Sequence, residues 1–234
     1  MSHYEHESFS DGDWEDRGDL IWNEFDWEQY LRQQDHFLHH YLELYNKHRK
    51  REDRLDYVAS LMNWDMEDWT PSESSGDVEN QPPPILFEEE ACEDDELDPY
   101  TIHRHPVYIA VKAILLSLEA ALTKLTAKAA NDSQIIPHIC PFSTALRECE
   151  NNTLLAVQAI DFGDYALGTA QLKRSLRALN QAMASLDALD GADPKTFKPF
   201  AQEVQTRLFD IREIWLRMMA FCREEINRQG DEGA

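Results

Sequence analysis

The sequence predicts an all-α protein: an antiparallel, up-and-down helical bundle with an additional N-terminal helix and long disordered acidic segments. Apolar residues recur at helical spacing through most of residues 101–229, and no strand pattern competes with them. The expected order is an acidic disordered tail (1–25), an N-terminal helical segment (26–63), an acidic, proline-containing disordered linker (64–100), the bundle domain (101–229) and a short tail (230–234).

The N-terminal helix has a recognisable start. Asp26, with Gln29 three residues later, forms a capping-box pattern that predicts a helix from about residue 27 to 50. At about 100° per residue, its apolar side chains share one face, which we expect to meet the bundle. That face consists of Trp27, Leu31, Leu38, Tyr41, Leu42 and Tyr45. The pattern then shifts around the axis, so we expect a bend near 51–53 and a second short helix ending near Asn63.

The following segment, residues 64–98, is strongly acidic and carries no Lys or Arg. Such a segment buries too little apolar surface to offset its ordering entropy, so it is predicted to be disordered. Ile85, Leu86 and Phe87 lie within it, between prolines and glutamates. Two interpretations stay open: a solvated linker whose apolar residues have no role, or a short linear motif that docks into a hydrophobic groove on this chain or another.

Prolines mark the starts of most of the predicted bundle helices. Pro106 and Pro141 are placed in first turns, and Asp193 with Pro194 supplies an N-cap and a proline at the first helical position. The predicted helices are 106–130, 141–161, 164–190 and 195–228. Because the links between them are short, neighbouring helices are expected to run antiparallel.

The last two helices carry apolar residues at heptad a and d spacing, which is typical of helices packed along their length. The first seam consists of Tyr165, Thr169, Leu172, Leu176, Leu179, Met183 and Leu186. The second consists of Phe197, Ala201, Val204, Leu208, Ile211, Trp215, Met218 and Cys222.

The hairpin formed by residues 151–179 resembles one tetratricopeptide repeat. Leu155 and Ala156 match the first helix of that repeat, and Gly163, Asp164 and Tyr165 match its turn. The small and large packing residues of the second helix are matched by Gly168, Leu172, Ser175 and Leu176. The pattern does not recur at the repeat period, so we interpret it as close helix-hairpin packing. A true repeat would imply peptide binding.

Charge is unevenly distributed along the chain. The net charge is −23, and residues 1–100 hold most of the acids, whereas acids and bases nearly balance in residues 101–234. A nucleic-acid binder would show a basic stripe, so direct contact with nucleic acid is disfavoured, as is contact with anionic membranes. The apolar segment 106–125 is interrupted by Lys112 and Glu119 and is interpreted as a buried helix, not a membrane span.

The first residues show no basic and apolar signal-peptide pattern, so a cytoplasmic location is expected. Cys92, Cys140, Cys149 and Cys222 form no CxxC pair, and we expect reduced thiols, with Cys149 and Cys222 in the core. No GxSxG, HExxH or phosphate-binding glycine loop occurs. The sequence therefore predicts a non-enzymatic protein without a cofactor.

A histidine-rich stretch, residues 36–48, raises the question of a metal site. His36, His40 and Glu43 lie on adjacent turns of one helix face, which is permissive geometry for a transition metal. That face is expected to point away from the bundle, whereas metal sites in bundles use residues that project inward from several helices. These three residues are therefore weak candidates for metal ligands.

The leading functional hypothesis is a protein-interaction or scaffolding bundle with unknown protein partners, for which a homodimer is one option. Its acidic segment, including Ile85, Leu86 and Phe87, would engage a basic partner or the bundle's own Lys173, Arg174 and Arg177. One alternative is an acidic nucleic-acid mimic or chaperone for basic proteins. A second is a ferritin-like metal-binding bundle.

Overall fold

The computed structural model describes residues 22–64, 101–128, 136–192 and 194–232. About 90% of it is helical, and these ranges contain no strand, which confirms the all-α prediction. The elements are α1 (Glu24–His48), α2 (Arg54–Leu61), the short 3-10 helix η3 (Ile102–Arg104), α4 (Pro106–Lys128), α5 (Ile136–Asp161), α6 (Tyr165–Ala192) and α7 (Pro194–Glu232). Most of the predicted acidic tail and linker lies outside the described residues.

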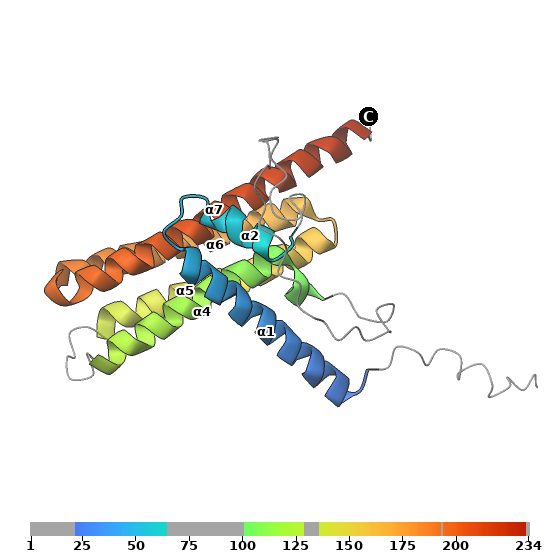
Figure 1. The fold of residues 1–234 in the computed structure, drawn as a ribbon. Helices are drawn as coiled ribbons and strands as arrows, with labels where there is room; N and C mark the ends of the chain where they lie inside the picture. The colour runs from blue at the N-terminus through green and yellow to red at the C-terminus, as the bar shows by residue number, and fades with distance from the viewer. Residues whose placement is uncertain (1–21, 65–100, 129–135, 193, 233–234) are drawn as a thin grey trace, which may run out of the picture.

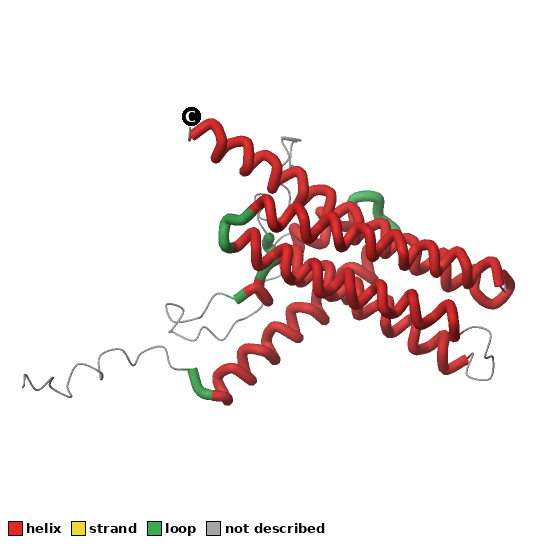
Figure 2. Tube along the Cα trace, turned by 180° about the vertical axis from the view of Figure 1, so that it is seen from behind, coloured by secondary structure: helices red, strands yellow, loops and turns green. Residues whose placement is uncertain are grey.

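Helices α4 to α7 form the predicted up-and-down bundle (Figures 1 and 2). Successive helices pack against each other, and α4 also contacts α7, which closes the bundle. Helix α1 crosses α4, and its amino-terminal end points away from the bundle (Figure 1). The carboxyl-terminal part of α7 runs on beyond the other helices.

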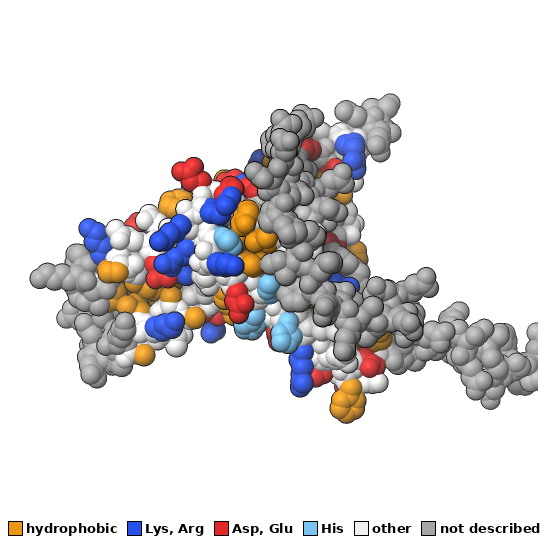
Figure 3. All heavy atoms as spheres, viewed as in Figure 1, with side chains coloured by type: hydrophobic (Ala, Val, Ile, Leu, Met, Phe, Trp, Pro, Cys, Tyr) orange, Lys and Arg blue, Asp and Glu red, His pale blue; other side chains and the backbone are white. Residues whose placement is uncertain are grey.

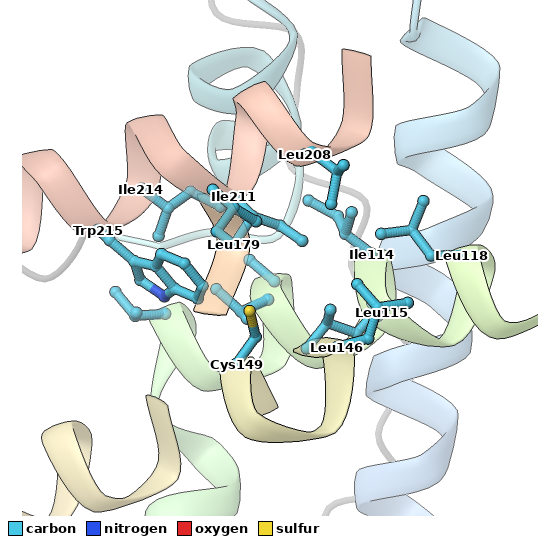
Figure 4. Packing of buried hydrophobic residues seen from close by; sticks show 14 of the residues in the cluster. Ile114, Leu115, Leu118, Leu146, Cys149, Leu179, Leu208, Ile211, Ile214 and Trp215 are labelled. Atoms are coloured by element: carbon cyan, nitrogen blue, oxygen red, sulfur yellow. The ribbon is translucent and has the colours of Figure 1, made fainter. Parts of the chain in front are cut away.

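One continuous apolar core joins the bundle to α1 and α2. In the bundle it contains the residues shown in Figure 4, to which α7 contributes Trp215, α6 Leu179 and α5 Leu146. The predicted seam of α7 is buried apart from half-buried Ala201, and the α6 seam is buried at Leu172, Leu179 and Leu186. Cys149 and Cys222 are also buried, as predicted.

The predicted start of α1 is wrong by one turn. Asn23, not Asp26, is the N-cap, and its side chain accepts hydrogen bonds from the backbone N–H groups of Phe25 and Asp26 at 2.8 and 3.3 Å. The Asp26 carboxylate in turn accepts from the Asn23 N–H at 2.9 Å. Asp26 is thus the second member of a capping box rather than its first. The predicted bend near 51–53 is confirmed.

The predicted starts and ends of two other elements also differ. Pro141 lies inside α5, which begins at Ile136, because Pro137 already occupies the first turn where a missing N–H costs nothing. At the other end of the chain, α7 continues to Glu232, so the predicted tail from residue 230 is mostly helix. Trp64, assigned to the linker, is half-buried and stacks on Tyr41 with ring centroids 5.4 Å apart.

The face of α1 that meets the bundle is rotated relative to the predicted one. Its buried residues are Tyr30, Gln34, Tyr41, Leu44 and Tyr45. Of the predicted face, Tyr41 and Tyr45 are buried, Leu38 and Leu42 are half-buried, and Trp27 and Leu31 are exposed. At about 100° per residue this difference is a rotation of about 60°, which leaves one side of the apolar stripe uncovered.

A buried carboxylate ties α1 and α2 to α7. Asp210 on α7 is 4% exposed. It accepts hydrogen bonds from the Tyr45 hydroxyl on α1 and from two guanidinium nitrogens of Arg54 on α2, with Nε at 2.7 Å. Burial, and then the neighbouring carboxylate, raise the pKa of Tyr45, so its phenol stays protonated and donates. The charge of Asp210 is therefore satisfied by residues that lie far away in the sequence.

Further polar contacts follow the same seam. Asp56 on α2 pairs with Arg217 on α7, and Arg207 donates to the side-chain oxygen of Asn46 at 3.4 Å. Inside the bundle, Lys112 on α4 pairs with Glu150 on α5. Glu119, about two turns further along α4, is half-buried. Burial opposes the charge on Lys112, but the hydrogen bond to Glu150 and the charges of Glu150 and Glu119 raise its pKa overall.

The α5–α6 hairpin is the most extensive helix pairing of the bundle. Gly163 adopts a left-handed φ of 77°, and Asp164 caps α6 by accepting from the Leu167 N–H at 2.9 Å. Gly168 is buried against α5, where a Cβ would lie 2.7 Å from Cγ1 of Ile160. A side chain at this position would force Ile160 to shift, so the helix spacing favours the small residue singled out in the sequence.

We expect Gly168→Ala to destabilise the protein by about 1 kcal/mol, because overpacking of about 1–3 kcal/mol outweighs a helix-propensity gain of about 1 kcal/mol. In an Ile160→Ala background, which removes the clashing atoms, the same change should be stabilising. Urea denaturation of the four proteins measures both effects. The same sign of effect in both backgrounds would contradict the close approach.

We expect Asp210→Ala to lower the free energy of unfolding by about 3 kcal/mol, because it leaves the Arg54 charge and the Tyr45 hydroxyl without their acceptor in a largely buried seam. Asp187→Ala, at an exposed position on α6, is the control and should change stability by less than about 0.5 kcal/mol. Denaturant titration compares the two, and equal effects would show that the buried carboxylate has no special role.

Candidate functional site

A polar hollow lies on the outer side of the α5–α6 hairpin. Its volume is about 510 Å³. The residues that line it are Glu148, Asn151, Asn152, Arg174, Arg177, Ala178 and Gln181. Both arginines belong to the basic cluster singled out in the sequence, and the structure places them side by side with three carboxamides.

The antiparallel hairpin explains this arrangement. Because Gly163 forms the turn between α5 and α6, residues that lie about equally far before and after it are opposite each other. Asn151 and Asn152 on α5 therefore face the turn of α6 that carries Arg174 and Arg177. The sequence reasoning missed the carboxamides, although counting outward from Gly163 was a signal that could have found them.

The electrostatics of the hollow favour an anionic ligand. Arg174 and Arg177 are exposed, and in the part of the chain that the structure describes neither guanidinium forms an ion pair. Glu148 is the only acid among the lining residues. Guanidinium groups bind carboxylates through paired hydrogen bonds, and carboxamides supply both a donor and an acceptor that suit a peptide backbone.

Lys173 does not line this hollow. It is exposed on α6, next in sequence to Arg174. The apolar candidates Ile85, Leu86 and Phe87 lie outside the described residues, as does Cys92.

The metal candidates do not form a cluster. His36 and Glu43 are exposed, whereas His40 is half-buried, so the face is less remote from the bundle than the periodicity predicted. Histidine side chains lie at the surface along α1 in Figure 3. Within the described ranges, no group of three or more His, Cys, Asp or Glu residues is arranged to hold a metal ion.

Two buried thiols and one half-buried histidine have structural roles. Burial raises the pKa of Cys149 to about 12 and that of Cys222 to about 11, so both stay protonated and poorly nucleophilic near neutral pH. Burial also lowers the pKa of His105, which Asp161 partly opposes. The neutral ring accepts a hydrogen bond from the Val107 N–H at 3.2 Å and so helps to cap the start of α4.

Helix α4 contains the one stretch in the described ranges, Pro106–Ala127, that is long and apolar enough to cross a membrane. Of its most apolar window, 61% is buried inside the fold. The central helix of a bundle passes the same test, and α4 packs on α1, α5 and α7.

No family model, curated protein or solved structure matches this chain. The resemblance of residues 151–179 to a tetratricopeptide repeat therefore rests on the hairpin itself. The hairpin turns at Gly163 and its helices approach closely at Gly168, whereas Leu155, matched to the first helix of the repeat, is 46% exposed.

Proposed function

We propose that this chain is a non-enzymatic protein-interaction bundle and that the hollow on the α5–α6 hairpin binds an extended acidic segment. The proposal rests on one observation. Arg174 and Arg177, which form no ion pair in the described ranges, line the same hollow as the carboxamides of Asn151, Asn152 and Gln181. Carboxylate side chains would meet the guanidinium groups, and the peptide backbone would meet the carboxamides.

Two sources of an acidic segment fit this chemistry. One is the chain itself, because residues 64–98 carry many acids and no Lys or Arg. The other is a partner protein, in which case the chain's own segment would compete with the partner for the hollow. Either source makes the interaction dependent on ionic strength, because exposed charges are screened within about 10 Å at 0.1 M salt.

A second candidate function is an acidic mimic or chaperone that binds basic proteins through the first hundred residues. The net charge of −23 and the concentration of acids in that half favour it. This function would use the acidic half directly, independently of Arg174 and Arg177, so charge reversal in the hollow separates the two proposals.

We expect Arg174→Glu combined with Arg177→Glu to reduce the recovery of partner proteins by about tenfold when the full chain is purified from the cells that make it. The control is a reversal at two exposed cations elsewhere, Lys124→Glu with Arg212→Glu, which changes net charge equally. Quantitative mass spectrometry of the bound proteins is the measurement.

A loss of partner proteins from the Arg174 and Arg177 double variant alone would support the proposal. Equal recovery of partner proteins with both double variants would exclude the hollow as the binding site. A third protein that lacks residues 66–98 tests for competition. Its partner recovery should rise if the chain's own acidic segment occupies the hollow, and should stay unchanged if the partner is the sole ligand.

A further inference from the structure

The rotation of α1 leaves a second surface uncovered. Four apolar residues, Trp27, Leu31, Leu38 and Leu42, follow one side of the helix over about four turns. Trp27 is 41% exposed and Leu31 is 44% exposed, and the other two are half-buried. We call these four residues the α1 flank. An apolar row at helical spacing is the kind of surface onto which the apolar face of another helix packs.

Contacts with neighbouring residues hold the amino-terminal end of the α1 flank in place. At this end of α1 the Tyr30 hydroxyl is hydrogen-bonded to Thr101, and the guanidinium of Arg104 lies 5.4 Å from the Tyr30 ring centroid. Trp27 packs edge-on against Trp22 and Tyr30, with centroids 5.0 and 6.0 Å away. A surface fixed in this way loses little conformational entropy when a ligand binds.

Acidic residues border the exposed part of the α1 flank. Glu24, Glu28 and Asp35 lie within three or four residues of Trp27 or Leu31, so they share that side of the helix. The nearby Arg32 is already bonded to Glu28 at 2.9 Å. An apolar surface bordered by negative charge favours a ligand that is apolar in the centre and basic at its edges.

Charge distinguishes three ligands that could cover the α1 flank: a second copy of the chain, the chain's own apolar segment, and another protein. A second copy would place Glu24, Glu28 and Asp35 opposite the same acids. The chain's own Ile85, Leu86 and Phe87 are followed directly by three glutamates and lie in a segment without a single base. A partner with Lys or Arg beside its apolar residues avoids this repulsion and gains attraction to the acidic border.

We propose that the α1 flank docks an amphipathic, basic helix of another protein. This goes beyond the function proposed above, since it is a separate surface on another helix and its charge preference is opposite to that of the α5–α6 hollow. The two surfaces would let one chain hold an acidic and a basic partner segment together.

The test uses the full chain and a synthetic amphipathic peptide with leucines at helical spacing and lysines on the other positions. Two matched peptides accompany it: one with glutamate in place of every lysine, and one with the same composition but no apolar face. Isothermal titration calorimetry gives the affinities. Trp27→Ser with Leu31→Ser removes the exposed half of the α1 flank. Phe209→Ser with Leu216→Ser, at exposed apolar positions on α7, is the control.

We expect the lysine peptide to bind, and the α1 double variant to weaken its affinity by about tenfold or more, while the α7 control binds as the wild type does. The glutamate peptide and the peptide without an apolar face should bind at least tenfold more weakly. If the serine variant fails to fold, Glu28→Lys with Asp35→Lys tests the same surface and should weaken the lysine peptide similarly.

Other outcomes would overturn the proposal. Equal binding by the α1 and α7 variants, or equal binding of the lysine and glutamate peptides, would show that the α1 flank does not select a basic helix. A dimer that the Trp27 and Leu31 substitutions convert to a monomer in sedimentation would assign this surface to a second copy. Peptide binding that appears only after Ile85, Leu86 and Phe87 are all changed to Ser would assign it to the chain's own segment.

Discussion

The buried carboxylate of Asp210 is the constraint on which the arrangement of this molecule depends. A charge in the interior is tolerated only where it is paired and hydrogen-bonded, because its desolvation otherwise costs several kcal/mol. Arg54 and Tyr45, which pair with it, come from α2 and α1. The bundle therefore contains a polar site that is satisfied only when the N-terminal helices are docked, and this favours one docking geometry over others that bury similar apolar area.

That geometry decides which surfaces of the chain remain open. With Tyr41 and Tyr45 turned into the core, α1 presents Trp27 and Leu31 on its acidic side. The α5–α6 hairpin, held close by Gly168, presents Arg174 and Arg177 with their carboxamide neighbours. A protein that uses surfaces of opposite charge on a rigid bundle is suited to bringing partners together, which agrees with the proposed interaction role.

Much of this architecture could be predicted from the sequence, and the errors have identifiable causes. The heptad seam predicted for α7 is buried apart from half-buried Ala201, because a long amphipathic helix repeats one signal many times. The face of α1 was predicted about 60° away from the observed one. The prediction assumed that polar Gln34 is exposed and apolar Trp27 is buried, whereas Gln34 is buried and Trp27 is exposed. Pairing between distant residues, such as Asp210 with Arg54, leaves no local signature. The carboxamides of the hollow are ordinary exposed residues until the hairpin register is known.

Hydrogen exchange of the full chain tests the central role of Asp210 most directly. In Asp210→Asn protein, backbone amides of α1 and α2 should lose protection by at least about tenfold, while the amides of α5 and α6 keep the protection they have in the wild type. That pattern would show that the carboxylate holds the N-terminal helices on the bundle. Unchanged protection in α1 and α2, or an equal loss throughout all helices, would contradict it.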